Sequence, residues 1–237
     1  MLYSLVHNIA FAHYPKTAGS AIAEWFRRSF PDACYVRPGH PHVDVRRSLA
    51  WLSGGRSLPP FERMRYLARA SNWWLPHQPL PELPAQIRIL GVVRPPLEML
   101  ASLAAYWQRS PTNPNPRDRL VSAAWEGRFA DFVRLAIGSR LPSYATFFDV
   151  GGPSWSNTRI IRFDDVESSL RRACQEFGID ALVDLPRKNC RPEATGALIT
   201  AAGLEASLQD QVRRHFAWYH AMVEGTVTTT RPFPTAA

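Results

Sequence analysis

Lysine is the residue type that this chain most lacks. Of its 28 basic residues only Lys16 and Lys188 are lysines, and all the others are arginines. A sequence that otherwise uses arginine for positive charge indicates a chemical requirement where it keeps a lysine in a turn. Lys16 occupies such a turn, at the centre of the segment "IAFAHYPKTAGSAIAEWF" (9–26).

Cysteines and long apolar runs are also scarce. The three cysteines are too few and too scattered for a disulfide framework or a zinc site, so we expect reduced thiols. No stretch approaches the roughly 18 apolar residues of a membrane helix, and no apolar signal segment precedes the first expected strand. We therefore expect a cytoplasmic protein without stable membrane insertion.

The length and the charge of the chain limit its class. With 237 residues, 46% of them hydrophobic, the chain is expected to form one domain over 1–237 with a full core. Its formal net charge is +8 and its pI is about 9.9. This balance favours an anionic partner such as a nucleotide, a sulfated or phosphorylated ligand or a nucleic acid, although an arginine-rich solvated surface would give the same balance.

Short apolar segments alternate with segments of helical periodicity. Strands are expected at 8–14, 86–93 and 158–163. Helical apolar spacing or helix-start signals predict one helix that begins at Ser20. They predict further helices at 60–70, 94–107, 119–137, 164–178 and 197–224. Strands that alternate with helices predict an α/β fold, with a mostly parallel sheet and helices on both of its faces.

The turn around Lys16 has the features of an anion site. A strand that runs through a tight turn into a helix leaves backbone N–H groups free at the positive end of the helix dipole. Gly19 lets the backbone approach a ligand, and Thr17 and Ser20 add hydroxyl donors. Lys16 is able to reach over a bound anion as a point charge. An ordinary loop with an exposed lysine would have the same letters, and the Walker pattern G-x-x-x-x-G-K-[ST] is absent.

Two motifs resemble those of the sulfotransferases that use 3′-phosphoadenosine 5′-phosphosulfate (PAPS). "YPKTAGS" (14–20) resembles their 5′-phosphosulfate loop. "GVVRPPLEMLASLAAYW" (91–107) resembles their strand, R-D-P and helix, which carries a serine eight residues after the arginine. The chain resembles bacterial carbohydrate O-sulfotransferases, and the resemblance implies a P-loop-type fold. The donor-binding residues that it implies in the loop are Pro15, Lys16, Thr17, Ala18, Gly19, Ser20 and Ala21.

The second motif implies a site for the 3′-phosphate of the donor. Arg94 and Ser102 match the family's arginine and serine, and an arginine fork with a hydroxyl suits a phosphate. Pro95 replaces the family's aspartate, for which we expect a local change without loss of binding. A weaker likeness in "LPRKNCRP" (185–192) implies that Arg187, Lys188 and Asn189 lie near the donor.

The resemblance also implies a reaction. A hydroxyl of the acceptor attacks sulfur, the 5′-phosphate leaves, and Lys16 stabilises the charge on the leaving oxygen without a metal. The expected general base is His77, with His40, His42 or a carboxylate as alternatives. The acceptor is expected to be a small molecule or a carbohydrate, bound by 33–85 and 108–157 as acceptor-side or lid elaborations, and an amine or a phenol stays open.

Two other functions are compatible with parts of the sequence. A P-loop kinase for a small metabolite needs Mg²⁺, and the sequence has no obvious set of ligands for it. A nucleotide- or nucleic-acid-binding module would use clustered basic and aromatic residues. The arginines are instead spread along the chain, so we expect no nucleic-acid partner.

Overall fold

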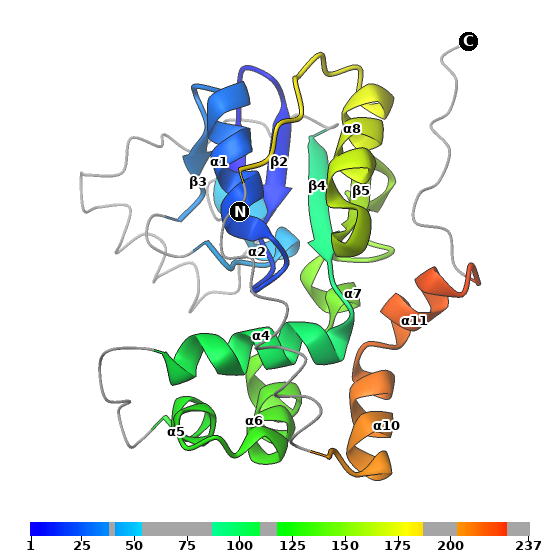
Figure 1. The fold of residues 1–237 in the computed structure, drawn as a ribbon. Helices are drawn as coiled ribbons and strands as arrows, with labels where there is room; N and C mark the ends of the chain where they lie inside the picture. Colours follow the sequence, from blue (N-terminus) through cyan, green and yellow to red (C-terminus); the bar gives the residue numbers. More distant parts are fainter. Residues whose placement is uncertain (38–40, 54–86, 110–117, 187–202, 227–237) are drawn as a thin grey trace.

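The computed structural model describes residues 1–37, 41–53, 87–109, 118–186 and 203–226, which form an α/β fold around one five-stranded sheet (Figure 1). The strand order is β3-β1-β2-β4-β5. β2, β4 and β5 are parallel to one another, whereas β1 is antiparallel to both β2 and β3. The strands are β1 (Leu2–Ser4), β2 (Ile9–Ala12), β3 (Cys34–Tyr35), β4 (Arg88–Val93) and β5 (Thr158–Arg162).

The three strands expected from the sequence are confirmed, and they are the parallel ones. The sheet as a whole is mixed, because β1 and β3 add an antiparallel edge that the sequence did not predict. These two strands have three and two residues, which is too short to show a periodic pattern. The expectation of a mostly parallel sheet therefore holds for its centre and fails at the β1–β3 edge.

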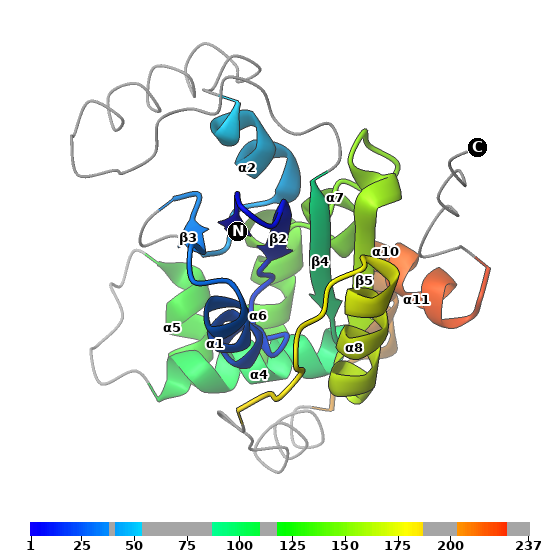
Figure 2. The same ribbon diagram turned by 90° about the horizontal axis from the view of Figure 1, so that it is seen from above.

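Helices cover both faces of the sheet, as expected. Side chains of β2 alternate between the two faces: Ile9 and Phe11 pack with α1 and α8, whereas Ala10 and Ala12 pack on the opposite side with α2 and α4. In Figure 2, α1 and α8 lie on one side of the strands and α2 lies on the other. The helices named here are α1 (Gly19–Ser29), α2 (Val45–Leu52), α4 (Pro96–Gln108) and α8 (Val166–Glu176).

Most of the remaining helices of the described chain pack in the same core cluster as α4. The helix expected over 119–137 is divided at Gly127, whose φ of 74° ends the first part. The last expected helix is likewise two helices, and the helix expected at 60–70 lies outside the described residues. The additional elements are α5 (Arg119–Trp125), α6 (Phe129–Leu135), the π-helical turn η1 (Ala136–Arg140), α7 (Tyr144–Phe147), the 3₁₀ turns η2 (Trp155–Asn157) and η3 (Phe163–Asp165), α10 (Ala206–His215) and α11 (Ala217–Val223).

Two loops leave the sheet at the same end of its parallel strands. β2 and β4 are adjacent and parallel, so the loop after Ala12 and the residues after Val93 emerge side by side. α4 runs across this end of the strands, toward which the arrow of β4 points in Figure 1. Nothing in the described chain forms a helix long and apolar enough to cross a membrane.

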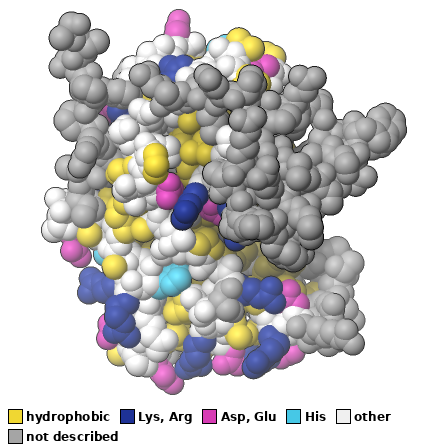
Figure 3. All heavy atoms as spheres, turned by 180° about the vertical axis from the view of Figure 1, so that it is seen from behind, with side chains coloured by type: hydrophobic (Ala, Val, Ile, Leu, Met, Phe, Trp, Pro, Cys, Tyr) yellow, Lys and Arg dark blue, Asp and Glu magenta, His cyan; other side chains and the backbone are white. Residues whose placement is uncertain are grey.

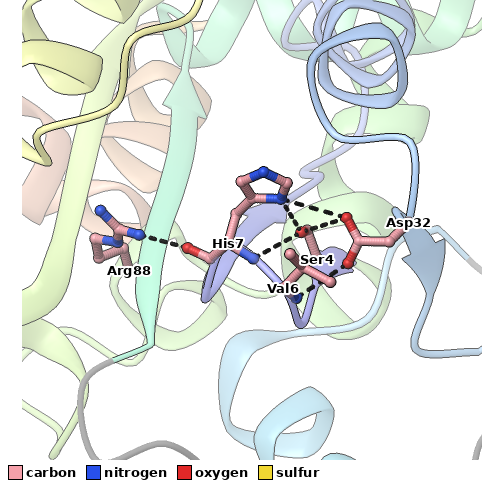
Figure 4. Close-up of polar contacts among 5 residues, drawn as sticks. All are labelled: Ser4, Val6, His7, Asp32 and Arg88. Atoms are coloured by element: carbon pink, nitrogen blue, oxygen red, sulfur yellow. Dashed lines mark hydrogen bonds and ion pairs between the residues drawn. The ribbon is translucent and has the colours of Figure 1, made fainter.

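A polar network holds the opposite end of the parallel strands, at the β1–β2 turn (Figure 4). The Asp32 carboxylate accepts hydrogen bonds from the Ser4 hydroxyl at 2.7 Å and from the Val6 N–H at 3.1 Å, and His7 Nδ1 lies 3.4 Å from it. Arg88 of β4 donates to the carbonyl of His7. The network therefore ties the β1–β2 turn to the segment that follows α1 and to the neighbouring strand.

Candidate functional site

The loop between β2 and α1 is held in an unusual backbone conformation. Lys16 and Ala18 both have φ of 60°, the left-handed region that costs a residue other than glycine about 1–2 kcal/mol. No side chain caps the N-terminus of α1 at Ala18, so its first N–H groups remain available as donors. Strained backbone beside uncapped donors is a combination that is found at ligand sites.

Thr17 stabilises the loop from inside. Its side chain is fully buried and its hydroxyl donates to the carbonyl of Tyr14 at 3.0 Å. The Tyr14 hydroxyl in turn donates to the carbonyl of Pro142 at 2.7 Å. We expected the Thr17 hydroxyl to be a donor for the anion, but it is used within the loop, and Ser20 is the exposed hydroxyl at the start of α1.

His13 explains why residue 19 is a glycine. A Cβ atom on Gly19 would lie 1.7 Å from His13 Nε2, so any larger residue would collide with the imidazole. The sequence suggested that a ligand would use this space, whereas the structure fills it with a side chain. Burial lowers the pKa of His13 to about 3, so its ring is neutral. Its buried Nδ1 has no hydrogen-bond partner among the described residues.

Three cationic side chains gather around the loop. The Lys16 amine lies 4.7 Å from the centre of the Tyr106 ring, on α4. Partial burial lowers the pKa of Lys16, and the nearby charges of Arg109 and Arg94 lower it further. The carboxylate paired with Arg94 is that of Glu98, 3.3 Å from its Nε. The site therefore has more positive than negative charge, which a bound anion would balance.

Arg94 is fixed by contacts on several sides. Its side chain is only 12% exposed, and the guanidinium lies 4.3 Å from the centre of the Phe163 ring. The Tyr144 hydroxyl donates to the Arg94 carbonyl at 2.8 Å and accepts its N–H at 3.3 Å. Glu98 contacts Nε, and the two terminal nitrogens of the Arg94 guanidinium have no partner within the described part of the chain. They are the donors of the guanidinium that could bind a phosphate.

One face of α4 carries Ser102, which the sequence predicted as a site residue, and two candidate residues that the sequence reading missed. Ser102, Tyr106 and Arg109 stand at positions i, i+4 and i+7, which share one side of a helix. Ser102 is half-buried, Tyr106 is 53% exposed, and Arg109, directly after the helix, is exposed. The helical spacing from Ser102 is the signal in the sequence that would have identified Tyr106 and Arg109.

His42 is a second neutral imidazole beside the loop. Its Nδ1 lies 2.9 Å from the carbonyl oxygen of His13, and a carbonyl only accepts, so Nδ1 has the proton and Nε2 has the lone pair. The two rings meet edge to face at 4.5 Å. Partial burial lowers the pKa of His42, an effect that the His13 carbonyl partly opposes and that Lys16 strengthens. At neutral pH, His42 is therefore able to accept a proton at Nε2.

A hollow of about 570 Å³ opens between α1, β3 and the segment around His42. Ser20 belongs both to its wall and to the first turn of α1, so the hollow adjoins the loop. The described residues that line it are His13, Ser20, Ala23, Glu24, Arg27, Arg28, Tyr35, Pro41 and His42.

The structure brings part of the expected site together. Lys16 and Arg94 share one electrostatic environment, and Pro15, Ala18 and Ala21 lie in the loop and the first turn of α1 as expected. Five of the expected residues lie outside the described residues: His40, His77, Arg187, Lys188 and Asn189. Within the described ranges, no group of three or more His, Cys, Asp or Glu side chains could hold a metal ion.

Comparisons of the chain with protein-family models, with curated proteins and with solved structures find no match in any of the three. The function has to be argued from the site itself.

Proposed function

We propose that this protein is a sulfotransferase with a P-loop-type fold that transfers a sulfuryl group from PAPS to a hydroxyl of a small-molecule or carbohydrate acceptor. The observation that carries the proposal is the meeting of Lys16 and Arg94. Two loops at the same end of the parallel strands β2 and β4 bring these cations close enough for Arg94 to lower the pKa of Lys16.

The two cations suit the two anionic groups of the donor. The N–H groups at the start of α1 and the Lys16 amine would bind the 5′-phosphosulfate. The terminal nitrogens of Arg94, with the Ser102 hydroxyl, would bind the 3′-phosphate. Since Arg94 is held by Phe163, Glu98 and Tyr144, it would lose little conformational freedom on binding.

The reaction follows from this placement. The acceptor oxygen forms a bond to sulfur, the bond between sulfur and the bridging oxygen of the 5′-phosphate breaks, and 3′-phosphoadenosine 5′-phosphate (PAP) leaves. Lys16 neutralises the charge that develops on that bridging oxygen. His42 is the described histidine that is able to take the acceptor's proton at Nε2. His77 remains our sequence-based prediction for this role.

Ligand-dependent melting provides the test, because each candidate function implies a different ligand. PAP at a hundred times its dissociation constant should stabilise the fold by about 2.7 kcal/mol, and adenosine 5′-phosphate should stabilise it less. Incubation with PAPS and a panel of hydroxyl acceptors should then give products heavier by one sulfuryl group. Stabilisation by ATP with Mg²⁺ or by single-stranded DNA, with none by PAP, would contradict the proposal.

Basic side chains are mixed with acidic ones on part of the surface. On the face shown in Figure 3, Lys and Arg side chains lie among Asp and Glu side chains. Several basic residues of the described chain form ion pairs with acidic ones, such as Arg128 with Asp131 at 2.6 Å. A phosphate backbone binds best to a continuous basic surface, so this mixture supports a small anionic ligand over a nucleic acid.

A further inference from the structure

The hollow beside His42 has a charge that the proposed donor site does not explain. We propose that this hollow binds the acceptor, and that the acceptor is a small hydroxylated organic anion whose acidic group contacts Arg27. The word acceptor rests on the proposed function, whereas the ligand's chemical class rests on the side chains that line the hollow.

Arg27 is the basis for the charge of the ligand. Its guanidinium lies 4.9 Å from the centre of the Tyr35 ring, and no carboxylate within the described part of the chain pairs with it. The adjacent Arg28 differs, because it donates to the Asp184 carbonyl at 3.0 Å and lies 4.0 Å from its carboxylate. A guanidinium on an aromatic ring at the wall of a hollow is a common arrangement for binding a carboxylate or a phosphate.

The charged side chains among the residues that line the hollow leave its wall net positive. Arg27 and Arg28 are positive and Glu24 is negative, while Asp184, which is not one of the lining residues, offsets part of the charge of Arg28. Burial lowers the pKa of His13, and partial burial that of His42, so both rings are neutral at neutral pH. Lys16 lies close enough to lower both values further, so the field at the mouth of the hollow is positive.

The remaining wall suits hydroxyl groups. Ser20 has a hydroxyl and His42 has an accepting Nε2, while the Tyr35 ring offers a flat apolar surface. A volume of about 570 Å³ lies within the range of roughly 300–1,000 Å³ found for small-molecule sites. A hydroxyl near His42 would also lie next to the loop that contains Lys16, since Ser20 and His13 belong to both.

Matched pairs of acidic and neutral compounds test the ligand class directly. Ligand-observed NMR titrations would compare glucuronate with glucose, galacturonate with galactose, and 4-hydroxybenzoate with 4-hydroxybenzyl alcohol. For at least one pair we expect the acid to bind about tenfold more tightly than its neutral partner. The preference should disappear in Arg27→Gln and persist in Arg171→Gln, a control on an exposed position of α8.

A further variant separates this inference from the donor site. Arg94→Ala should weaken PAP binding about tenfold or more and keep the preference for acids, because the two sites use different cations. If the acids are not preferred in any pair, or if the preference survives Arg27→Gln, the inference is wrong. If the preference follows Arg27 but PAP does not bind the wild-type chain, the acceptor role falls together with the proposed function.

Discussion

Lys16 is the residue on which the proposed chemistry depends most. It is held in a left-handed conformation and partly buried, and this burial together with the charges of two nearby arginines lowers the pKa of its amine. Lys16→Ala should reduce turnover about a hundredfold or more, the usual loss when one preorganised charge is removed from a transition state. PAP affinity should fall much less. Steady-state kinetics together with PAP calorimetry would show this, and near-normal turnover in the variant would contradict the assignment.

Tyr106 positions the Lys16 amine. Because the chain has only two lysines, selective ¹³C labelling of lysine gives two sets of signals, which a Lys188→Arg variant assigns. The Tyr106 ring current should shift the Lys16 Cε signal. Tyr106→Phe should keep this shift, whereas Tyr106→Leu should abolish it and lower kcat about two- to fivefold, as expected from a cation–π contact of about 0.5–1 kcal/mol.

The same NMR signal distinguishes a positioning role from a general effect on folding. The pKa of Lys16, read from this signal, should lie below 10.5 in the free protein and rise when PAP binds, since an anion favours the charged amine. Equal shifts in the Phe and Leu variants would show that Tyr106 does not contact the amine.

His42 gives the proposed reaction a defined pH dependence. A general base must be neutral, so kcat should rise with pH through a pKa below 6.5 and then level. His42→Gln should remove this rising limb and leave PAP binding near the wild-type value. His215→Gln serves as a control, because the ring of His215 contacts the Leu141 carbonyl. If the limb is lost in His77→Gln and retained in His42→Gln, the base is His77.

At the scale of elements, α4 and the residues next to it carry most of the proposed donor site outside the Lys16 loop. Arg94 precedes this helix, Ser102 lies within it, and Tyr106 and Arg109 lie near its end. Arg94→Ala should weaken PAP binding by about 1.5–3 kcal/mol, and Ser102→Ala by about 1 kcal/mol, because the first contact is charge-assisted. Calorimetry with PAP and with adenosine 5′-phosphate provides the measurement. If both ligands lose the same affinity, these residues do not contact the 3′-phosphate.

The sequence predicted those elements whose apolar pattern is long enough to read. The four- and six-residue buried strands β2 and β4 were recognised, as was α8 with its terminal Gly178 at a φ of 64°. β1 and β3 were missed because two or three residues show no period. The division of the 119–137 helix was missed because a single glycine does not end a helix without its tertiary context.

The candidate site was predictable only where it depends on local chain order. The loop around Lys16 and the strand end at Arg94 follow from strand–turn–helix patterns. The packing of His13 on Gly19, the bond between Tyr144 and Arg94, and the hydrogen bond from His42 to His13 all join distant segments. Such contacts depend on the register of the strands and on the packing of the helices, which one sequence does not contain in readable form.

At the scale of the whole molecule, the polar network around Asp32 is a separate stabilising region, at the end of the parallel strands opposite the site. Burial of Asp32 opposes its ionisation, but the hydrogen bonds from Ser4, Val6 and His7 outweigh this effect and lower its pKa. A carboxyl whose pKa is lower in the folded than in the unfolded state stabilises the fold above the unfolded value. That contribution is lost as the pH falls through the folded value.

Asp32→Asn should therefore destabilise the fold by about 1 kcal/mol at pH 7, since its side chain is partly exposed. The difference from wild type should shrink as the pH falls below 3.8. Urea unfolding at pH 7 and in acid would measure both, and Asp180→Asn, on an exposed residue after α8, serves as the control. An equal difference at every pH would show that the charge of Asp32 is not responsible. PAP affinity should not change in this variant, because the network lies at the other end of the parallel strands.

The meeting of Lys16 and Arg94 also makes the ligand a reporter of folding. These residues come from loops that are far apart in the sequence and become neighbours only when β2 pairs with β4. The Tyr144 hydroxyl that holds Arg94 comes from a third segment, α7. A chain that has collapsed without the correct pairing would have all three residues and no site. Capture on immobilised PAP should therefore separate correctly assembled molecules from misfolded ones in any set of variants, including those with substitutions far from the site.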